Sequence, residues 1–127
     1  MDDKNTLYGL DYVLEEIVEE HQFLQISFDP RIYEINNFKI KYYPLNLYGY
    51  LNDDVLFHFR ERLFEVDFTL LSPELLIDKE ISNEYPQIKK ISRITRNDCH
   101  DIMTFKMEHD ESYQLLRELV EYFKQQD

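Results

Sequence analysis

The strongest constraint on the fold is a run of alternating apolar and polar residues in the middle of the chain. Val55, Phe57 and Phe59 alternate with Leu56, His58 and Arg60. The pattern resumes after a turn at residues 60–62, with Phe64, Val66, Phe68 and Leu70 as the apolar members. Successive side chains of a strand point to opposite faces, so such alternation is typical of strands with one buried face. The stretch therefore predicts an antiparallel hairpin.

Shorter patterns extend this sheet in both directions along the chain. Asn36 and Asn37 separate two apolar arms, and asparagine tolerates the positive φ that a two-residue hairpin turn needs. The stretch 44–52, which carries tyrosines, is predicted to be a loop or a short edge element. The further strands that we expect cover residues 23–28 (buried), 32–35, 38–43, 88–95 and 102–108, the last two forming a hairpin.

Helical periodicity appears at both ends of the chain. Leu7, Leu10, Leu14 and Ile17 recur at spacings of three and four, which predicts an amphipathic helix over 7–21. A second such stripe predicts a helix from about 110 to 125, and Ser72-Pro73 predicts the start of a short helix over about 73–80. The expected fold is one two-layer α+β domain spanning residues 1–127. Its antiparallel sheet has about five to six strands, with a helix at each end of the chain.

Composition excludes several classes of function. Only two glycines occur in 127 residues, whereas phosphate-cradling loops and dinucleotide fingerprints need several. Cys99 is the one cysteine, which precludes an internal disulfide and fits a reducing compartment. No apolar run approaches the roughly 18 residues of a membrane span, and the first ten residues lack the pattern of a secretion signal. We therefore expect a cytoplasmic protein with no membrane partner and no cofactor.

The acidic charge is concentrated near the N-terminus. The formal net charge is −12, and the predicted first helix carries carboxylates at i, i+4 spacing, which repel one another. A solvated helix face explains this pattern as well as a docking surface for a basic protein does. Free nucleic acid is disfavoured as a partner, because its phosphates need cations. The predicted acidic contact residues are Asp11, Glu15, Glu16, Glu19 and Glu20.

A cluster of tyrosines forms the second candidate contact surface. Tyr42, Tyr43, Tyr48 and Tyr50 lie within nine residues, and tyrosine combines a large contact area with a hydrogen-bonding tip. Strand alternation places Tyr42 in the core and Tyr43 on the opposite face. We predict that Tyr43, Tyr48 and Tyr50 contact a partner, whereas coverage of the sheet edge is the structural alternative.

Catalytic patterns are sparse. His58, Arg60 and Glu65 are residue types that a metal-independent ribonuclease uses, but cross-strand ion pairs explain the same charges. Asp98, Cys99, His100 and Asp101 offer metal-ligand types without an established spacing, so no metal site is predicted there.

The sequence thus favours a non-catalytic protein-binding domain. The leading hypothesis is a small acidic inhibitor of a basic or nucleic-acid-acting protein, such as an immunity protein, an antitoxin or a phage-type inhibitor. The first alternative is a regulatory or scaffold module of pleckstrin-homology type, which would bind peptide or lipid through the edge of a barrel. Lipid binding would need the cations at 89–96 to be clustered and exposed. The second alternative is an enzyme: a ribonuclease around His58 or a metal hydrolase around His100.

Overall fold

The computed structural model describes residues 9–77, 79–98 and 102–125. It confirms a two-layer α+β architecture with a helix near each end of the described chain. The elements are α2 (Gly9–His21), β1 (Leu24–Phe28), β2 (Arg31–Ile35), β3 (Phe38–Tyr43), β4 (Asn46–Leu51), β5 (Asp54–Glu61), β6 (Val66–Leu70), α3 (Glu74–Ile77), α4 (Pro86–Asp98), β7 (Met103–Met107) and α5 (His109–Phe123).

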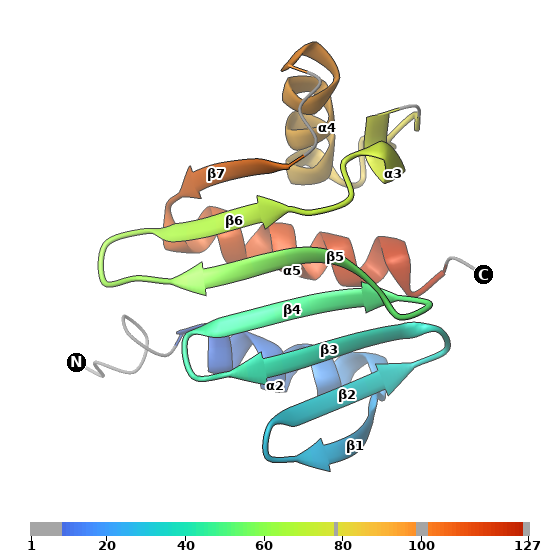
Figure 1. Ribbon diagram of the computed structural model, residues 1–127, viewed down its shortest axis with the longest axis vertical. Helices are drawn as coiled ribbons and strands as arrows, with labels where there is room; N and C mark the ends of the chain where they lie inside the picture. The colour runs from blue at the N-terminus through green and yellow to red at the C-terminus, as the bar shows by residue number, and fades with distance from the viewer. Residues whose placement is uncertain (1–8, 78, 99–101, 126–127) are drawn as a thin grey trace.

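The strands form one seven-stranded antiparallel sheet in the order β1 to β7, so the sheet has more strands than the five to six predicted. Each strand pairs with its neighbours in sequence, and β1 and β7 are the two edges (Figure 1). The predicted hairpin at Asn36-Asn37 is confirmed: Ile35 pairs with Phe38, and Asn36 has a φ of 53°.

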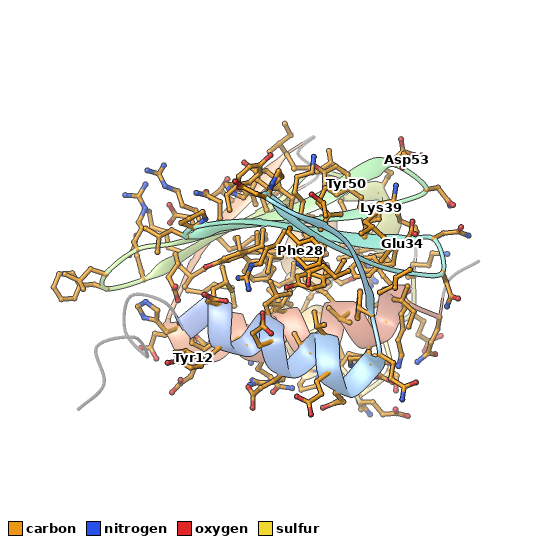
Figure 2. The ribbon with its side chains drawn as sticks, turned by 90° about the horizontal axis from the view of Figure 1, so that it is seen from below. Tyr12, Phe28, Glu34, Lys39, Tyr50 and Asp53 are labelled. Carbon is orange, nitrogen blue, oxygen red and sulfur yellow. The ribbon has the colours of Figure 1, made fainter. Side chains whose placement is uncertain are left out.

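Both long terminal helices lie against the same face of the sheet. Figure 1 shows α2 behind β3 and β4, with α5 behind β5 and β6. The inward side chains of the strands and the apolar stripes of the helices form the core, in which Phe38, Phe57, Phe59 and Phe68 are fully buried. Among the described residues, neither α2 nor α5 covers the other face of the sheet, which we call the open face (Figure 2).

Two segments differ from the sequence-based expectation. Residues 88–95 are not a strand but part of α4, where Ile88, Ile91, Ser92 and Thr95 are buried at helical spacing. The segment is rich in β-branched residues, which are typical of strands. Two residues of the buried stripe, Ser92 and Thr95, are polar, so the helical spacing of apolar side chains cannot be recognised from the sequence. Residues 44–52 are not a loop but contain the central strand β4. Its inward positions include Gly49, whose missing side chain hides the alternation.

The edges of the sheet also differ from expectation. β1 forms as predicted but is an exposed edge strand rather than a buried one. β5 extends through Glu61, so the β5–β6 turn comes later than predicted and Phe64 lies in it, 87% exposed.

Candidate functional site

The predicted contact residues lie on two opposite surfaces of the molecule. The acids of α2 belong to the helical layer, whereas Tyr43, Tyr48 and Tyr50 lie on the open face of the sheet. Figure 2 shows Tyr12 of α2 below the sheet and Tyr50 above it. The structure therefore does not combine the acids and the tyrosines into one flat contact surface.

Several acids of α2 are held by cations from other elements. Arg31 of β2 contacts Asp11 at 2.5 Å and Glu15 at 2.6 Å, while its guanidinium lies 4.7 Å from the centre of the Tyr42 ring. Arg117 of α5 contacts Glu16 at 3.1 Å. These pairs offset the i, i+4 repulsion within the helix, so tertiary contacts account for part of the acidic pattern.

The helical layer nevertheless stays strongly acidic. α2 and α5 together carry nine carboxylates and one arginine. Glu19, on the same helical stripe as Asp11 and Glu15, is exposed and has no ion-pair partner among the described residues. By contrast, three rows of residues paired across the open face of the sheet are more basic. They carry four cations, Lys39, Lys41, Arg60 and Lys106, and two carboxylates, Glu34 and Asp67. Most of the formal net charge of −12 therefore comes from α2 and α5.

A cleft of about 250 Å³ lies between α2 and α5. Its walls are rich in carboxylates, including Glu84 and Glu121, which sequence patterns do not indicate because these residues lie far from the first helix along the chain. The lining residues are Glu16, Ile17, Glu20, His21, Glu84, Tyr85, Gln114, Arg117, Glu118 and Glu121. This acidic cleft is suited to a cationic side chain from a partner.

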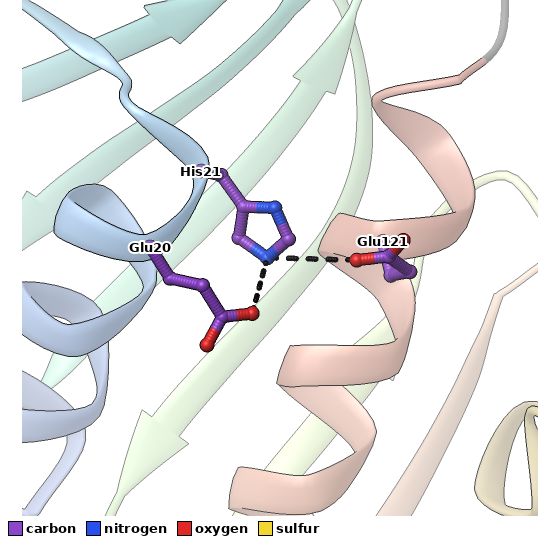
Figure 3. A group of neighbouring side chains, drawn as sticks. All are labelled: Glu20, His21 and Glu121. Carbon is purple, nitrogen blue, oxygen red and sulfur yellow. Dashed lines mark ion pairs between the residues drawn. The ribbon is translucent and has the colours of Figure 1, made fainter.

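His21 lies beside this cleft and contacts carboxylates from both helices. Its Nε2 lies 3.3 Å from Glu20 and 3.7 Å from Glu121 (Figure 3). These three side chains have the ligand types of a metal centre. However, the Lys124 ammonium lies 2.6 Å from Nδ1 and must donate to it, which places the ring proton on Nε2. A proton on Nε2 is incompatible with a metal bond there, so the arrangement fits a hydrogen-bonded helix junction better than a metal centre.

The three predicted contact tyrosines are packed among side chains of neighbouring strands. Tyr48 stacks on His58 with ring centres 4.3 Å apart and planes 7° from parallel, and Tyr43 meets Tyr48 edge-on. Lys41 lies 5.5 Å from the centre of the Tyr50 ring. Because His58 covers one face of Tyr48, the pair offers less ring surface to a nucleobase than a flat aromatic platform does.

The residues of the ribonuclease hypothesis are engaged separately. His58 Nε2 bonds to Asn46 Oδ1 at 2.9 Å, whereas Glu65 binds Lys106 of β7 at 2.9 Å. Asp67 takes the Arg62 guanidinium at 2.7 Å. The structure therefore supports the cross-strand ion-pair explanation of these charges.

Burial, and then the nearby Arg60, lower the pKa of His58, while Asp67 opposes them. We expect Arg60→Gln to raise the pKa of His58 toward its ordinary value of 6.5, because one repulsive charge is removed. An NMR titration of the imidazole resonances measures this shift. Arg62→Gln serves as the control: it also removes one arginine, but Arg62 is not among the charges that lower the pKa of His58, so no comparable rise is expected. A fall in the pKa of His58 in Arg60→Gln would contradict the assignment.

Two glutamates that the sequence analysis did not predict as buried, Glu61 and Glu118, lie in the interior. Glu61 is 2% exposed; it accepts a hydrogen bond from the Tyr113 hydroxyl and, at 3.2–3.3 Å, from the Leu10 backbone amide at the start of α2. Glu118 of α5 likewise accepts from the amides of Gln87 and Ile88 at the start of α4. Each carboxylate satisfies free N–H groups at a helix N-terminus. Their role is structural, and the signal for Glu61 was its inward register after Phe57 and Phe59.

The cations at 89–96 gather on α4. Lys89, Arg93 and Arg96 line a cleft of about 230 Å³ together with Glu80, while Lys90 lies 3.7 Å from Glu111. This small basic area lies toward the β7 side of the sheet (Figure 1). The pleckstrin-homology alternative also expected a barrel, whereas the described strands form an open sheet. Cys99, His100 and Asp101 lie outside the described residues.

Three comparisons with known proteins yield no match to this chain. No family model matches it, and neither the curated proteins nor the solved structures contain a match. Within the described ranges, no helix has both the length and the apolar character needed to cross a membrane. Any functional conclusion must therefore come from the surfaces described above.

Proposed function

We propose that the chain is a non-catalytic domain that binds a basic protein through its acidic helical layer. In this proposal it acts as a small inhibitor, such as an immunity protein, an antitoxin or a phage-type inhibitor of a nucleic-acid-acting enzyme. The observation that carries the proposal is the segregation of charge: nine carboxylates against one arginine on α2 and α5. Enzymes that act on nucleic acids present cations to phosphates, and an acidic face complements such a surface.

The contact residues in this proposal divide into two groups. In the first group, Glu20, Glu84 and Glu121 line the cleft, and Glu19 is exposed elsewhere on α2; these acids would face basic side chains of the partner. Asp11, Glu15 and Glu16 contribute to the same field, although each is already held by an arginine. A field of one sign accelerates encounter and orients the partner before close contact. Tyr43, Tyr48 and Tyr50 stay a predicted contact surface on the opposite face.

Charge reversal on the helical layer tests the proposal. The tagged chain is used to capture proteins from host cells, which are identified by mass spectrometry, and the affinity of the captured protein is then measured. We expect Glu19→Lys combined with Glu84→Lys to weaken binding by at least about tenfold, with a steep salt dependence in the unmodified chain. Both side chains are exposed and neither has an ion-pair partner among the described residues, so the fold should persist.

Asp54→Lys, at the exposed start of β5, reverses one charge outside the helical layer and is compared with Glu84→Lys alone. It should leave the affinity within about twofold. Equal loss in both variants, or binding that is insensitive to salt, would contradict docking through the helical layer.

A further inference from the structure

The edge strand β1 exposes apolar side chains that no described element covers. Leu24 is 65% exposed, Ile26 46% and Phe28 78%. The strand Leu24–Phe28 contains no charged residue. Long apolar edges are usually blunted by charges or proline, since their free backbone groups template the addition of another strand. The bulge between Gln25 and Ser27 is the irregularity that this edge carries.

The helix side of this edge is acidic. Phe28 pairs with Arg31, whose side chain reaches the helical layer and binds Asp11 and Glu15. Glu19 lies one turn further along the same stripe of α2 and is exposed, so the stripe carries three carboxylates, of which Arg31 contacts two. A strand added to β1 would therefore meet net negative charge on its helix-facing side.

The open-face side of the same edge is apolar. Ile26, Ile32 and Tyr50 line a shallow cleft of about 190 Å³, with Lys39, Lys41 and Asp53 around it. Lys39 is held by Asp53 at 3.0 Å and by Glu34 at 3.8 Å. Figure 2 shows Glu34, Lys39, Tyr50 and Asp53 together at one end of the sheet. The cleft offers an apolar pocket and disfavours a cation beside its lysines.

We propose that β1 accepts an extended segment of the basic partner as an eighth strand of the sheet. The added strand turns lysine or arginine toward Asp11, Glu15 and Glu19 and apolar side chains toward Leu24, Ile26 and the cleft. Backbone hydrogen bonds supply affinity in such strand addition, and alternate side chains supply specificity. A second copy of the chain is disfavoured as occupant, because it would bring another acidic α2 against the first. The inference rests on the proposed function, since it specifies how the basic partner docks.

Synthetic peptides test this geometry directly. The probe is an eight-residue peptide of alternating valine and lysine, compared with its valine–glutamate counterpart. We expect the lysine peptide to bind at low salt, to slow amide exchange in residues 24–28, and to bind at least about tenfold more tightly than the glutamate peptide. In an alternating strand all valine amides point to one edge and all lysine amides to the other. N-methylation of one set should therefore abolish binding, while N-methylation of the other set preserves it.

A matched pair of variants locates the site. Leu24→Lys combined with Phe28→Lys should weaken peptide binding by about tenfold or more, whereas Leu63→Lys combined with Phe64→Lys should change it by at most about twofold. Both doubles replace one exposed leucine and one exposed phenylalanine, so they alter charge and composition equally.

Three results would overturn the inference. Equal binding of both N-methylated peptides would show attraction by charge alone, which leaves the proposed function standing. Absence of binding by the lysine peptide would refute strand addition at β1. The capture experiment would still decide whether a basic protein binds the helical layer. Protection of residues 24–28 in a dimer of the chain alone would assign the edge to a second copy.

Discussion

Replacing Gly49 with alanine is expected to lower the free energy of unfolding by about 2–3 kcal/mol. A Cβ at this position of β4 would overlap the tip of the Phe57 ring, which is fully buried and pairs across the strands with Gly49. The ring has no free space to enter, since it packs against Phe38, Phe59 and Phe68. Chemical denaturation monitored by circular dichroism measures the loss.

A double-mutant cycle isolates the cause. In a Phe57→Leu background the ring tip is gone, so Gly49→Ala should no longer destabilise the fold. It should instead stabilise it by up to about 0.5–1 kcal/mol, because alanine loses less conformational entropy in a strand than glycine does. An equal cost of Gly49→Ala in both backgrounds would show that the backbone, and not the ring, demands glycine.

Removing the buried carboxylate of Glu61 is expected to be at least as costly. Glu61→Ala leaves the Tyr113 hydroxyl and the Leu10 amide without their acceptor, and about 3 kcal/mol of stability should be lost. Glu65→Ala, which removes an exposed partner of Lys106, should change stability by less than about 0.5 kcal/mol. Equal effects of the two variants would refute a structural role for Glu61.

The same carboxylate predicts a pH dependence of stability. Burial raises the pKa of Glu61 above its ordinary value of 4.5, despite the hydrogen bonds from Tyr113 and Leu10. Between that value and the raised one, the folded chain holds a proton that the unfolded chain releases. Rising pH therefore favours unfolding in this window. Relative to Glu61→Gln, which keeps an acceptor but does not titrate, the unmodified chain should lose stability as pH rises above about 4.5. A gain of stability with rising pH, relative to Glu61→Gln, would show instead that the ionised carboxylate of Glu61 stabilises the folded state.

The elements that the sequence predicted well are those whose burial follows one period. The hairpin at Asn36-Asn37, strand β6 and helix α5 each follow a regular apolar pattern, and the hairpin also has a suitable turn residue in Asn36. β4 was not predicted as a central strand because one of its inward positions is Gly49, which has no side chain and therefore interrupts the apolar alternation. α4 was misread because Ser92 and Thr95 are buried through hydrogen bonds to Leu76 and Ile91, which depend on tertiary packing or on the helix itself.

The candidate site was predictable only in part. The residue types were recognisable in sequence, but their distribution over two faces depends on which side of the sheet the helices cover. The arginines that hold the α2 acids come from positions 31 and 117, far from those acids in the chain. Periodicity within one helix cannot identify such partners.

The consecutive order of the strands has a consequence for folding kinetics. Five of the six strand pairings join segments connected by short turns, so each costs little loop-closure entropy. The exception is β6 with β7, whose closure spans Leu70 to Met103 and includes α3 and α4. Low contact order in the first six strands favours rapid zippering, and attachment of β7 is the step that chain topology makes slowest.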